Sequence, residues 1–218
     1  MMSGSQSGGE TRTQAERRAE SEARLLRAAL ELIAVQGFAG TTVAQIGQEA
    51  GYSRGLVTQH FGSKLGLARS LVGLIQKGFE QHTVRRVAEV PDCEILQAWI
   101  DRYMAALEAD SARYRAILAL QAESITSLDE LQPYIAALNE QVRAYLKRRL
   151  GDAQSRGEIP SNIDLHALVT AVLGMLRGTA SQYLIDPDNT DLHSVGTAAK
   201  GMVTAFLSEG ASVLDTTG

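Results

Sequence analysis

Apolar residues recur at helical spacing through most of this 218-residue chain. Residues three or four apart share one face of an α-helix, so this spacing predicts amphipathic helices. We find no sustained alternation of apolar and polar residues and no Asn-Gly or Asp-Gly pair, which are the features typical of strands and hairpins. The four prolines punctuate the helical segments. The pattern therefore predicts an all-α protein.

Capping signals divide this pattern into about nine helices. Thr13 and Thr42 each precede Glu or Gln by three residues, which is the capping-box spacing that begins a helix. Ser53 and Ser63 are single N-cap candidates. Together with the apolar spacing, these signals predict helices near 13–37, 43–50, 53–60, 63–88, 92–109, 111–122, 128–151, 164–184 and 191–208.

Length and composition limit the function classes. A chain of this size forms one or two domains with its own core. One cysteine, Cys93, excludes an intramolecular disulfide framework, and no apolar run reaches the roughly 20 residues that span a bilayer. The Ser/Gly-rich start does not resemble a secretory signal. We expect a cytoplasmic protein without membrane segments. We expect a tail at 1–12, a helix-turn-helix domain at 13–64, a larger helical domain at 65–210 and a second tail at 211–218.

Two short helices joined by a tight Gly-Tyr turn, after a longer helix, are typical of a three-helix helix-turn-helix domain. In that motif the second helix enters the major groove of DNA. The chain has a net charge of −4. Residues 1–64 contribute +1 to it, and the remainder contributes −5. The N-terminal part is therefore the better candidate for contact with a polyanion, although a small helical subdomain without DNA affinity would have the same spacing.

The segment after Ser53 has the chemistry that a recognition helix needs. It carries hydrogen-bonding side chains, and Gly55 permits a close approach of the backbone. Leu56, Val57 and Phe61 are suited to its inner face. The following helix begins at Ser63 and Lys64, where free amides and a positive charge favour a phosphate.

Three runs of residues, 37–46, 50–57 and 60–65, resemble the DNA-binding domain of TetR-type transcriptional regulators. The resemblance implies a homodimer on a nearly two-fold-symmetric operator, an effector-binding second domain, and more often a repressor than an activator. It implies no cofactor and no enzymatic activity. Carried over position by position, the DNA-facing residues are Thr42, Ser53, Arg54, Gly55, Thr58, Gln59, His60 and Lys64. For His60, packing at the helix end is the alternative.

Two positions depart from the family pattern. Thr58 stands where the family usually has a tyrosine that touches a phosphate, and its hydroxyl has a shorter reach. Gly47 stands where alanine is common, which should weaken the second helix by up to about 1 kcal/mol. Neither departure removes the motif.

The second domain is predicted to bind an effector and to dimerise. The 164–184 helix is apolar on more than one face and carries small residues, so we expect it to form a dimer seam with the 191–208 helix; burial within a monomer is the alternative. A pocket for a largely apolar effector is expected at Phe79, Trp99, Tyr103, Met104, Tyr114, Leu118 and Met175, although residues of these types at helical spacing are more often part of a core than of a ligand pocket. Glu123, Arg177 and Gln121 are candidates for polar groups in it.

Two other functions compete with this interpretation. Residues 51–55 match the Gly-x-Ser-x-Gly pattern, which would make Ser53 a hydrolase nucleophile, but that chemistry needs a strand before the serine and here a capped helix is predicted. The four histidines lack metal-ligand spacing, so no metal site is expected. The alternative from another class is a helical sensor or scaffold with a degenerate helix-turn-helix that no longer binds DNA.

Overall fold

The structure is a computed structural model that describes residues 13–78 and 84–209, and all regular elements within these ranges are helical. The predicted all-α class is confirmed, and nine α-helices are present in the described ranges. The α-helices are α1 (Gln14–Gly40), α2 (Val43–Glu49), α3 (Arg54–Phe61), α4 (Lys64–Gly78), α5 (Ile95–Ala109), α6 (Ser111–Thr126), α7 (Gln132–Ser155), α8 (Leu165–Ile185) and α9 (Leu192–Glu209). Short 3-10 helices are η2 (Asp92–Glu94), η3 (Asp129–Leu131) and η4 (Pro187–Asn189).

The helix ends follow local chemistry in most places. Both predicted capping boxes form, at Thr13 and at Thr42. Gly37 has φ 73° and ψ 169°, so the regular part of α1 ends there as predicted, and a further turn runs to Gly40. The fourth helix is predicted to reach about Ala88; α4 is described to Gly78, residues 84–86 are again helical, and residues 87–89 form a turn before Pro91. Residues 79–83 lie outside the described part of the chain.

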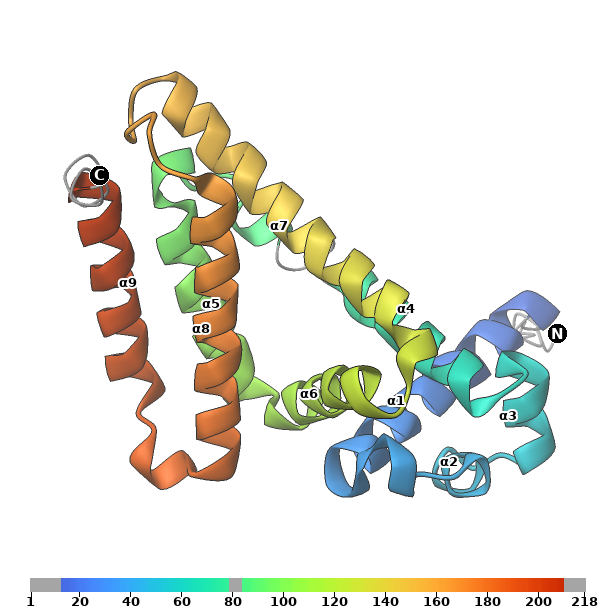
Figure 1. Cartoon of the computed structure of the whole chain (residues 1–218). Helices are drawn as coiled ribbons and strands as arrows, with labels where there is room; N and C mark the ends of the chain where they lie inside the picture. The colour runs from blue at the N-terminus through green and yellow to red at the C-terminus, as the bar shows by residue number, and fades with distance from the viewer. Residues whose placement is uncertain (1–12, 79–83, 210–218) are drawn as a thin grey trace, which may run out of the picture.

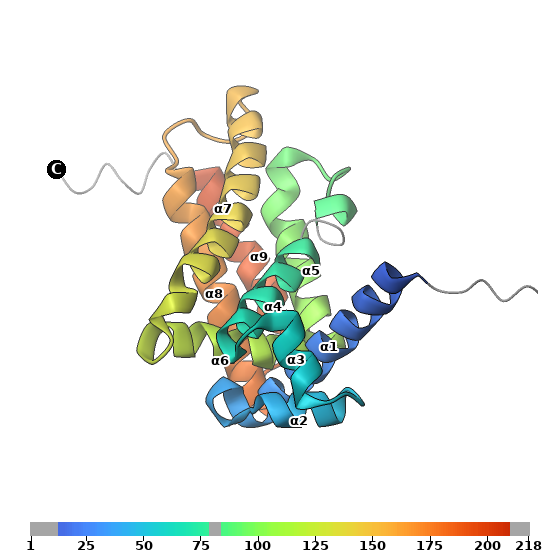
Figure 2. The same ribbon diagram turned by 90° about the vertical axis from the view of Figure 1, so that its right-hand side faces the viewer.

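The helices divide the molecule into two ends. In Figure 1, α5, α8 and α9 run along one another on the left, while α1, α2 and α3 lie at the lower right. Figure 2, turned by 90°, places α1–α3 together at the lower end. The helix α7 crosses from one end to the other and contributes Ile135 to the core near α1 and Leu146 to the core of the bundle. No helix in the described ranges is both long and apolar enough to cross a membrane.

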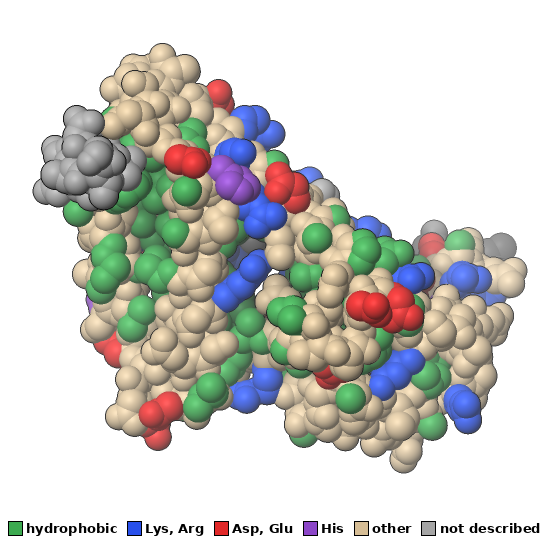
Figure 3. Space-filling model, viewed as in Figure 1, with side chains coloured by type: hydrophobic (Ala, Val, Ile, Leu, Met, Phe, Trp, Pro, Cys, Tyr) green, Lys and Arg blue, Asp and Glu red, His purple; other side chains and the backbone are tan. Residues whose placement is uncertain are grey.

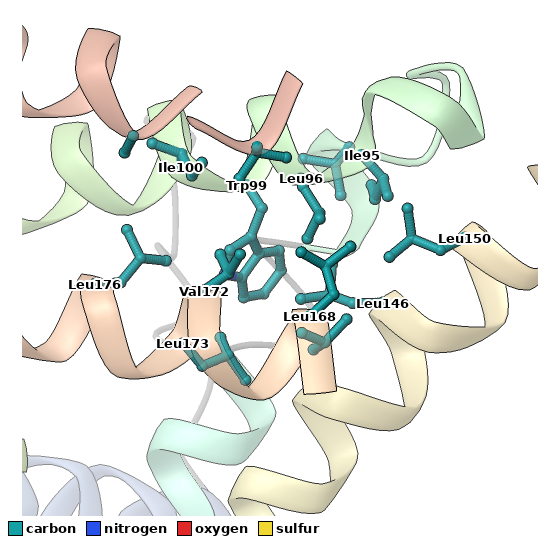
Figure 4. Packing of buried hydrophobic residues seen from close by; sticks show 14 of the residues in the cluster. Ile95, Leu96, Trp99, Ile100, Leu146, Leu150, Leu168, Val172, Leu173 and Leu176 are labelled. Carbon is teal, nitrogen blue, oxygen red and sulfur yellow. The ribbon is translucent and has the colours of Figure 1, made fainter. Parts of the chain in front are cut away.

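Each end has its own hydrophobic core. The core of the bundle joins residues of α5, α7, α8 and α9, and Figure 4 shows the Trp99 ring among leucine, isoleucine and valine side chains. The other core surrounds α1, where Leu25, Ile46, Val57 and Leu67 have at most 1% of their surface exposed. Leu120 of α6 belongs to this second core, so α6 is packed directly against the helix-turn-helix segment. The domain boundary expected after residue 64 stays a prediction.

Candidate DNA interface and ligand cavity

The α2–α3 turn is closed by two glycines. Gly51 has φ 76°, a left-handed conformation that glycine adopts without strain. The Tyr52 amide donates a hydrogen bond of 2.7 Å to the Gly47 carbonyl, and a Cβ at Gly47 would lie 3.0 Å from the Tyr52 carbonyl oxygen. Gly47 thus does more than lower helix propensity: its missing side chain lets the turn pack tightly against α2.

The recognition-helix candidate α3 has an inner and an outer face. Ser53 caps it, with its Oγ accepting a hydrogen bond from the Leu56 amide at 3.3 Å. Val57 is buried, whereas Arg54 and Gln59 are exposed. Gly55 and Thr58 are also exposed, as are Thr42 and Ser53 at the helix starts. Six of the eight predicted DNA-facing residues therefore lie at the surface.

The other two predicted residues, His60 and Lys64, are half-buried and make internal contacts. The Nε2 atom of His60 lies 2.9 Å from the Ser21 hydroxyl of α1, which fits the packing alternative for this histidine. The Lys64 ammonium donates to the Ala39 carbonyl at 3.1 Å and lies 4.4 Å from the centre of the Phe38 ring. Burial lowers the pKa of Lys64, and the nearby Glu123 carboxylate opposes that shift.

Glu123 links α6 to the end of α1. Its Oε1 atom accepts hydrogen bonds from the amides of Phe38 at 2.9 Å and Ala39 at 3.1 Å. The sequence suggests this residue as a polar group of the ligand pocket, but it does not line the cavity described below. The turn at residues 37–40 is instead held from two sides, by Glu123 of α6 and by Lys64 of α4.

A cavity of about 330 Å³ lies among α4, α5, α6, α7 and α8. Of the residues predicted for a ligand pocket, four line it: Trp99, Tyr103, Tyr114 and Leu118. The rings of Tyr103 and Tyr114 meet edge to face, with centroids 5.0 Å apart. The structure thus brings together three of the four aromatic residues of the predicted set, together with Leu118.

The two predicted methionines do not line this cavity. Met104 is buried in the core of the bundle on the side of α9, where a Cβ at Gly196 would be 3.4 Å from its Cγ. Met175 packs against the same core without lining the cavity. Phe79 is outside the described residues. Apolar spacing alone could not separate these positions, because both methionines lie on inward faces of their helices.

Polar residues of the cavity are only partly foreseen by the sequence. Gln121 and Arg177, suggested from the sequence, both line it. Arg102, Arg113 and Asn139 line it as well, and sequence reasoning missed them. Charged residues on a helix normally indicate a solvated face, so nothing in the local pattern marked these two arginines as cavity residues.

The Ser53 hydrolase alternative has no structural support. The residues before Ser53 form α2 and a turn rather than a strand. The Ser53 hydroxyl caps α3, and His60, the nearest histidine in sequence, contacts Ser21 instead.

Comparison with known proteins places these features in a family. A family model for bacterial regulatory proteins of the tetR family matches residues 25–71. The HTH-type transcriptional regulator SrpR of Pseudomonas putida is 28% identical over 163 residues, which cover 73% of each chain. An uncharacterised HTH-type transcriptional regulator of Pseudomonas putida, TtgW, is 32% identical over 106 residues, or 47% of this chain and 75% of that protein.

Solved structures agree on the fold. A TetR-family regulator from Rhodococcus sp. superposes with a TM-score of 0.76 at 17% identity, over 87% of this chain and 99% of that one. AibR, solved in complex with isovaleryl coenzyme A and operator DNA, superposes with a TM-score of 0.69 at 19% identity, over 84% and 97% of the two chains. With the family match on the helix-turn-helix segment and the relatives that extend beyond it, the chain belongs to the TetR family of transcriptional regulators and is not an enzyme.

Proposed function

We propose that the protein is a dimeric repressor that binds a palindromic DNA operator and releases it when a small molecule binds. The observation that carries this proposal is the exposed polar face of α3, opposite Val57 and Phe61, which pack into the core around α1. A face of this kind can enter the major groove, where side chains read base edges. Such a role places the protein in the cytoplasm, with the DNA.

Within this interface the residues have different roles. Arg54 and Gln59 are exposed on α3 and have the donor and acceptor groups that recognise guanine and adenine edges. Lys64 is assigned to a phosphate, which it reaches by giving up its hydrogen bond to the Ala39 carbonyl. Thr58 donates its hydroxyl to the Arg54 carbonyl at 3.3 Å, so its phosphate contact is the weakest of the set.

An exposed small-residue surface on α8 and α9 supports the dimer. Gly174 and Gly178 are exposed, and a Cβ added to either would meet no atom within 4 Å. On α9, Met202 is 65% exposed and Phe206 42% exposed. Figure 3 shows hydrophobic side chains at the surface on this side of the molecule. Small residues let a partner helix approach closely, and the exposed apolar side chains gain burial in a four-helix seam.

Two helices connect the cavity to the DNA-binding end. Ile75 of α4 and Gln121 of α6 line the cavity. The same two helices hold the turn at 37–40 through Lys64 and Glu123. A ligand that binds better to one spacing of the two recognition helices shifts the population toward it, and operator affinity changes by the same differential free energy. Proteins of this fold that have been solved with a ligand include AibR, with isovaleryl coenzyme A, and FadR of Bacillus subtilis, with stearoyl-CoA.

The test is binding to DNA from upstream of the protein's own gene, measured by fluorescence anisotropy at several salt concentrations. Arg54→Ala should weaken specific binding by about 1–3 kcal/mol and relax the base preference. Lys64→Gln should reduce the log–log salt slope by about one for each phosphate that the protein no longer neutralises. Lys77→Gln, an exposed cation at the far end of α4, is the control and should change neither quantity.

The alternative is a helical sensor whose helix-turn-helix no longer binds DNA. The internal contacts of His60 and Lys64 and the hydroxyl of Thr58, directed to its own helix, favour it. Equal, weak affinity for upstream and unrelated DNA, with no effect of Arg54→Ala, would support this alternative and contradict the repressor.

A further inference from the structure

The cavity has more positive charge than a pocket for an apolar molecule needs. Arg102, Arg113 and Arg177 line it, and the one carboxylate among the described lining residues belongs to Asp110. That carboxylate caps α6, where its Oδ1 accepts a hydrogen bond from the Arg113 amide at 3.1 Å. Within residues 13–78 and 84–209, none of the three guanidinium groups lies in an ion pair.

Arg177 is the clearest of the three. It comes from α8 in the middle of the molecule and is half-buried, and among the residues that the structure describes its guanidinium donates to a neutral amide oxygen, the Oδ1 of Asn139, rather than to a carboxylate. Burial lowers the pKa of Arg177, and the like charge of Arg143 acts in the same direction. A partly buried charge without a counter-ion costs free energy in the unliganded protein.

Arg102, from α5, contributes a second unsatisfied group to the lining of the same cavity. Its Nε–H is buried and finds no acceptor among the residues that the structure describes. Buried hydrogen-bond donors of native proteins nearly always have an acceptor. An unpaired donor beside a cavity is therefore a candidate to bind an acceptor atom of a ligand. Guanidinium groups bind planar carboxylates through paired hydrogen bonds.

Much of the remaining lining is aromatic or apolar. Trp99, Leu118 and Leu138 line them, together with the edge-to-face pair of Tyr103 and Tyr114. Burial raises the pKa of both tyrosines, so their hydroxyls stay protonated and can donate to an oxygen of the ligand. The cavity therefore combines a flat apolar surface with hydrogen-bond donors, the complement of a molecule with a ring or branched chain and an anionic end.

We propose that the effector is a small organic monocarboxylate whose carboxylate pairs with Arg177 and Arg102. This inference rests on the proposed ligand-responsive function, and it replaces the largely apolar effector expected from the sequence. With about 30 Å³ per water-sized group, the cavity of about 330 Å³ holds on the order of ten non-hydrogen atoms. An aromatic or short branched acid fits inside this volume, whereas a coenzyme A thioester is much larger and would extend outside it.

The experiment is calorimetric titration of the full chain, without DNA, with a panel of acids and their neutral amides. The panel is benzoate, phenylacetate, 3-phenylpropionate, isovalerate and hexanoate, and isovaleryl-CoA is tested beside it. We expect at least one acid to bind saturably and its amide to bind at least about 10-fold more weakly, because the amide cannot replace the charge pair. Equal binding of acid and amide, no binding of any acid, or binding of the thioester alone would overturn the proposal.

Substitutions test whether Arg177 binds the carboxylate of the acid. Arg177→Gln keeps a donor for Asn139 but removes the charge, and it should weaken binding of the preferred acid at least about 10-fold. Arg115→Gln is the matched control, because Arg115 is exposed on α6 and does not line the cavity. Without ligand, Arg177→Gln should unfold at the same or a higher temperature than the wild type, since it removes an uncompensated charge. A lower unfolding temperature with unchanged affinity would mean that Arg177 is structural and would refute the assignment.

The outcome also separates this inference from the proposed function. If the protein binds its operator but no acid binds, the proposed repressor function stands and the proposed carboxylate effector is refuted. An acid that binds through Arg177 without changing operator affinity confirms the ligand class and contradicts ligand-responsive repression.

Discussion

Gly37 is a residue whose backbone, rather than its side chain, determines the local structure. At φ 73° and ψ 169° it occupies a region that residues with a Cβ adopt only under strain. We expect Gly37→Ala to lower the free energy of unfolding by about 1–3 kcal/mol. Urea unfolding followed by circular dichroism measures the change.

Gly73 provides the matched control for that substitution. It lies inside α4 with nothing within 4 Å of an added Cβ, and its φ is not positive. Alanine has a higher helix propensity, so Gly73→Ala should raise the free energy of unfolding by up to about 1 kcal/mol. If both variants changed stability in the same direction, the strain assigned to Gly37 would be wrong.

At the scale of elements, α7 is joined to the segment before α5 by an ion pair. Arg149 of α7 donates to the Asp92 carboxylate and to the carbonyls of Val87 and Val90. The hydrogen bond from the Arg149 guanidinium holds the pKa of Asp92 below its usual value. The pair therefore stabilises the fold above the pKa of an unfolded aspartate, about 4, and this contribution is lost as the pH falls through the lower folded-state pKa.

Asp92→Asn tests this ion pair. At pH 7 it should lower the free energy of unfolding by about 1–2 kcal/mol, and the difference from wild type should shrink as the pH falls below about 4 through the lowered folded-state pKa, where the wild-type carboxyl also becomes neutral. Asp101→Asn is the control, because the Asp101 carboxylate is 60% exposed in its pair with Lys200 and should contribute less than about 1 kcal/mol. A constant difference between Asp92→Asn and wild type across pH would exclude the ion pair as the cause.

Glu123 makes the corresponding link between α6 and α1. Its two hydrogen bonds to backbone amides involve a charged acceptor, so Glu123→Ala should lower the free energy of unfolding by about 1–3 kcal/mol. Glu108→Ala, at an exposed position on α5, should change it by less than about 0.5 kcal/mol. Equal effects of the two substitutions in denaturant titrations would show that the turn at 37–40 does not depend on Glu123.

Local and distant interactions were not equally predictable at this scale. The caps at Thr13, Thr42 and Ser53 depend on residues three positions away, so the sequence alone located them. The Phe38 amide that Glu123 binds is 85 positions distant, and no local pattern reports such a contact. Glu123 is predicted from the sequence to lie near the ligand. Its helix, α6, does line the cavity with other residues, but the Glu123 side chain contacts the end of α1.

At the scale of the whole molecule, the proposed dimer predicts how a substitution on α8 changes the oligomeric state. Gly174 is exposed on α8 with open space around its Cβ position, so a larger side chain fits the monomer but meets a partner helix. Gly174→Gln should convert the protein from dimer to monomer in sedimentation velocity without lowering the helix content. Gly73→Gln, at an open glycine on α4, should remain dimeric. A Gly174→Gln protein that is still dimeric would place the seam elsewhere.

Residue types within a few positions of one another determine the all-α class, most helix boundaries, the caps and the exposed face of α3. Backbone preference, capping and amphipathic spacing are short-range effects, so the sequence alone is enough to predict these features. The inward contacts of His60 and Lys64, the separation of both methionines from the cavity, and the gathering of three arginines around it arise from packing between helices far apart in the chain. Burial and charge compensation depend on all the neighbours in space, and only the folded chain brings those neighbours together.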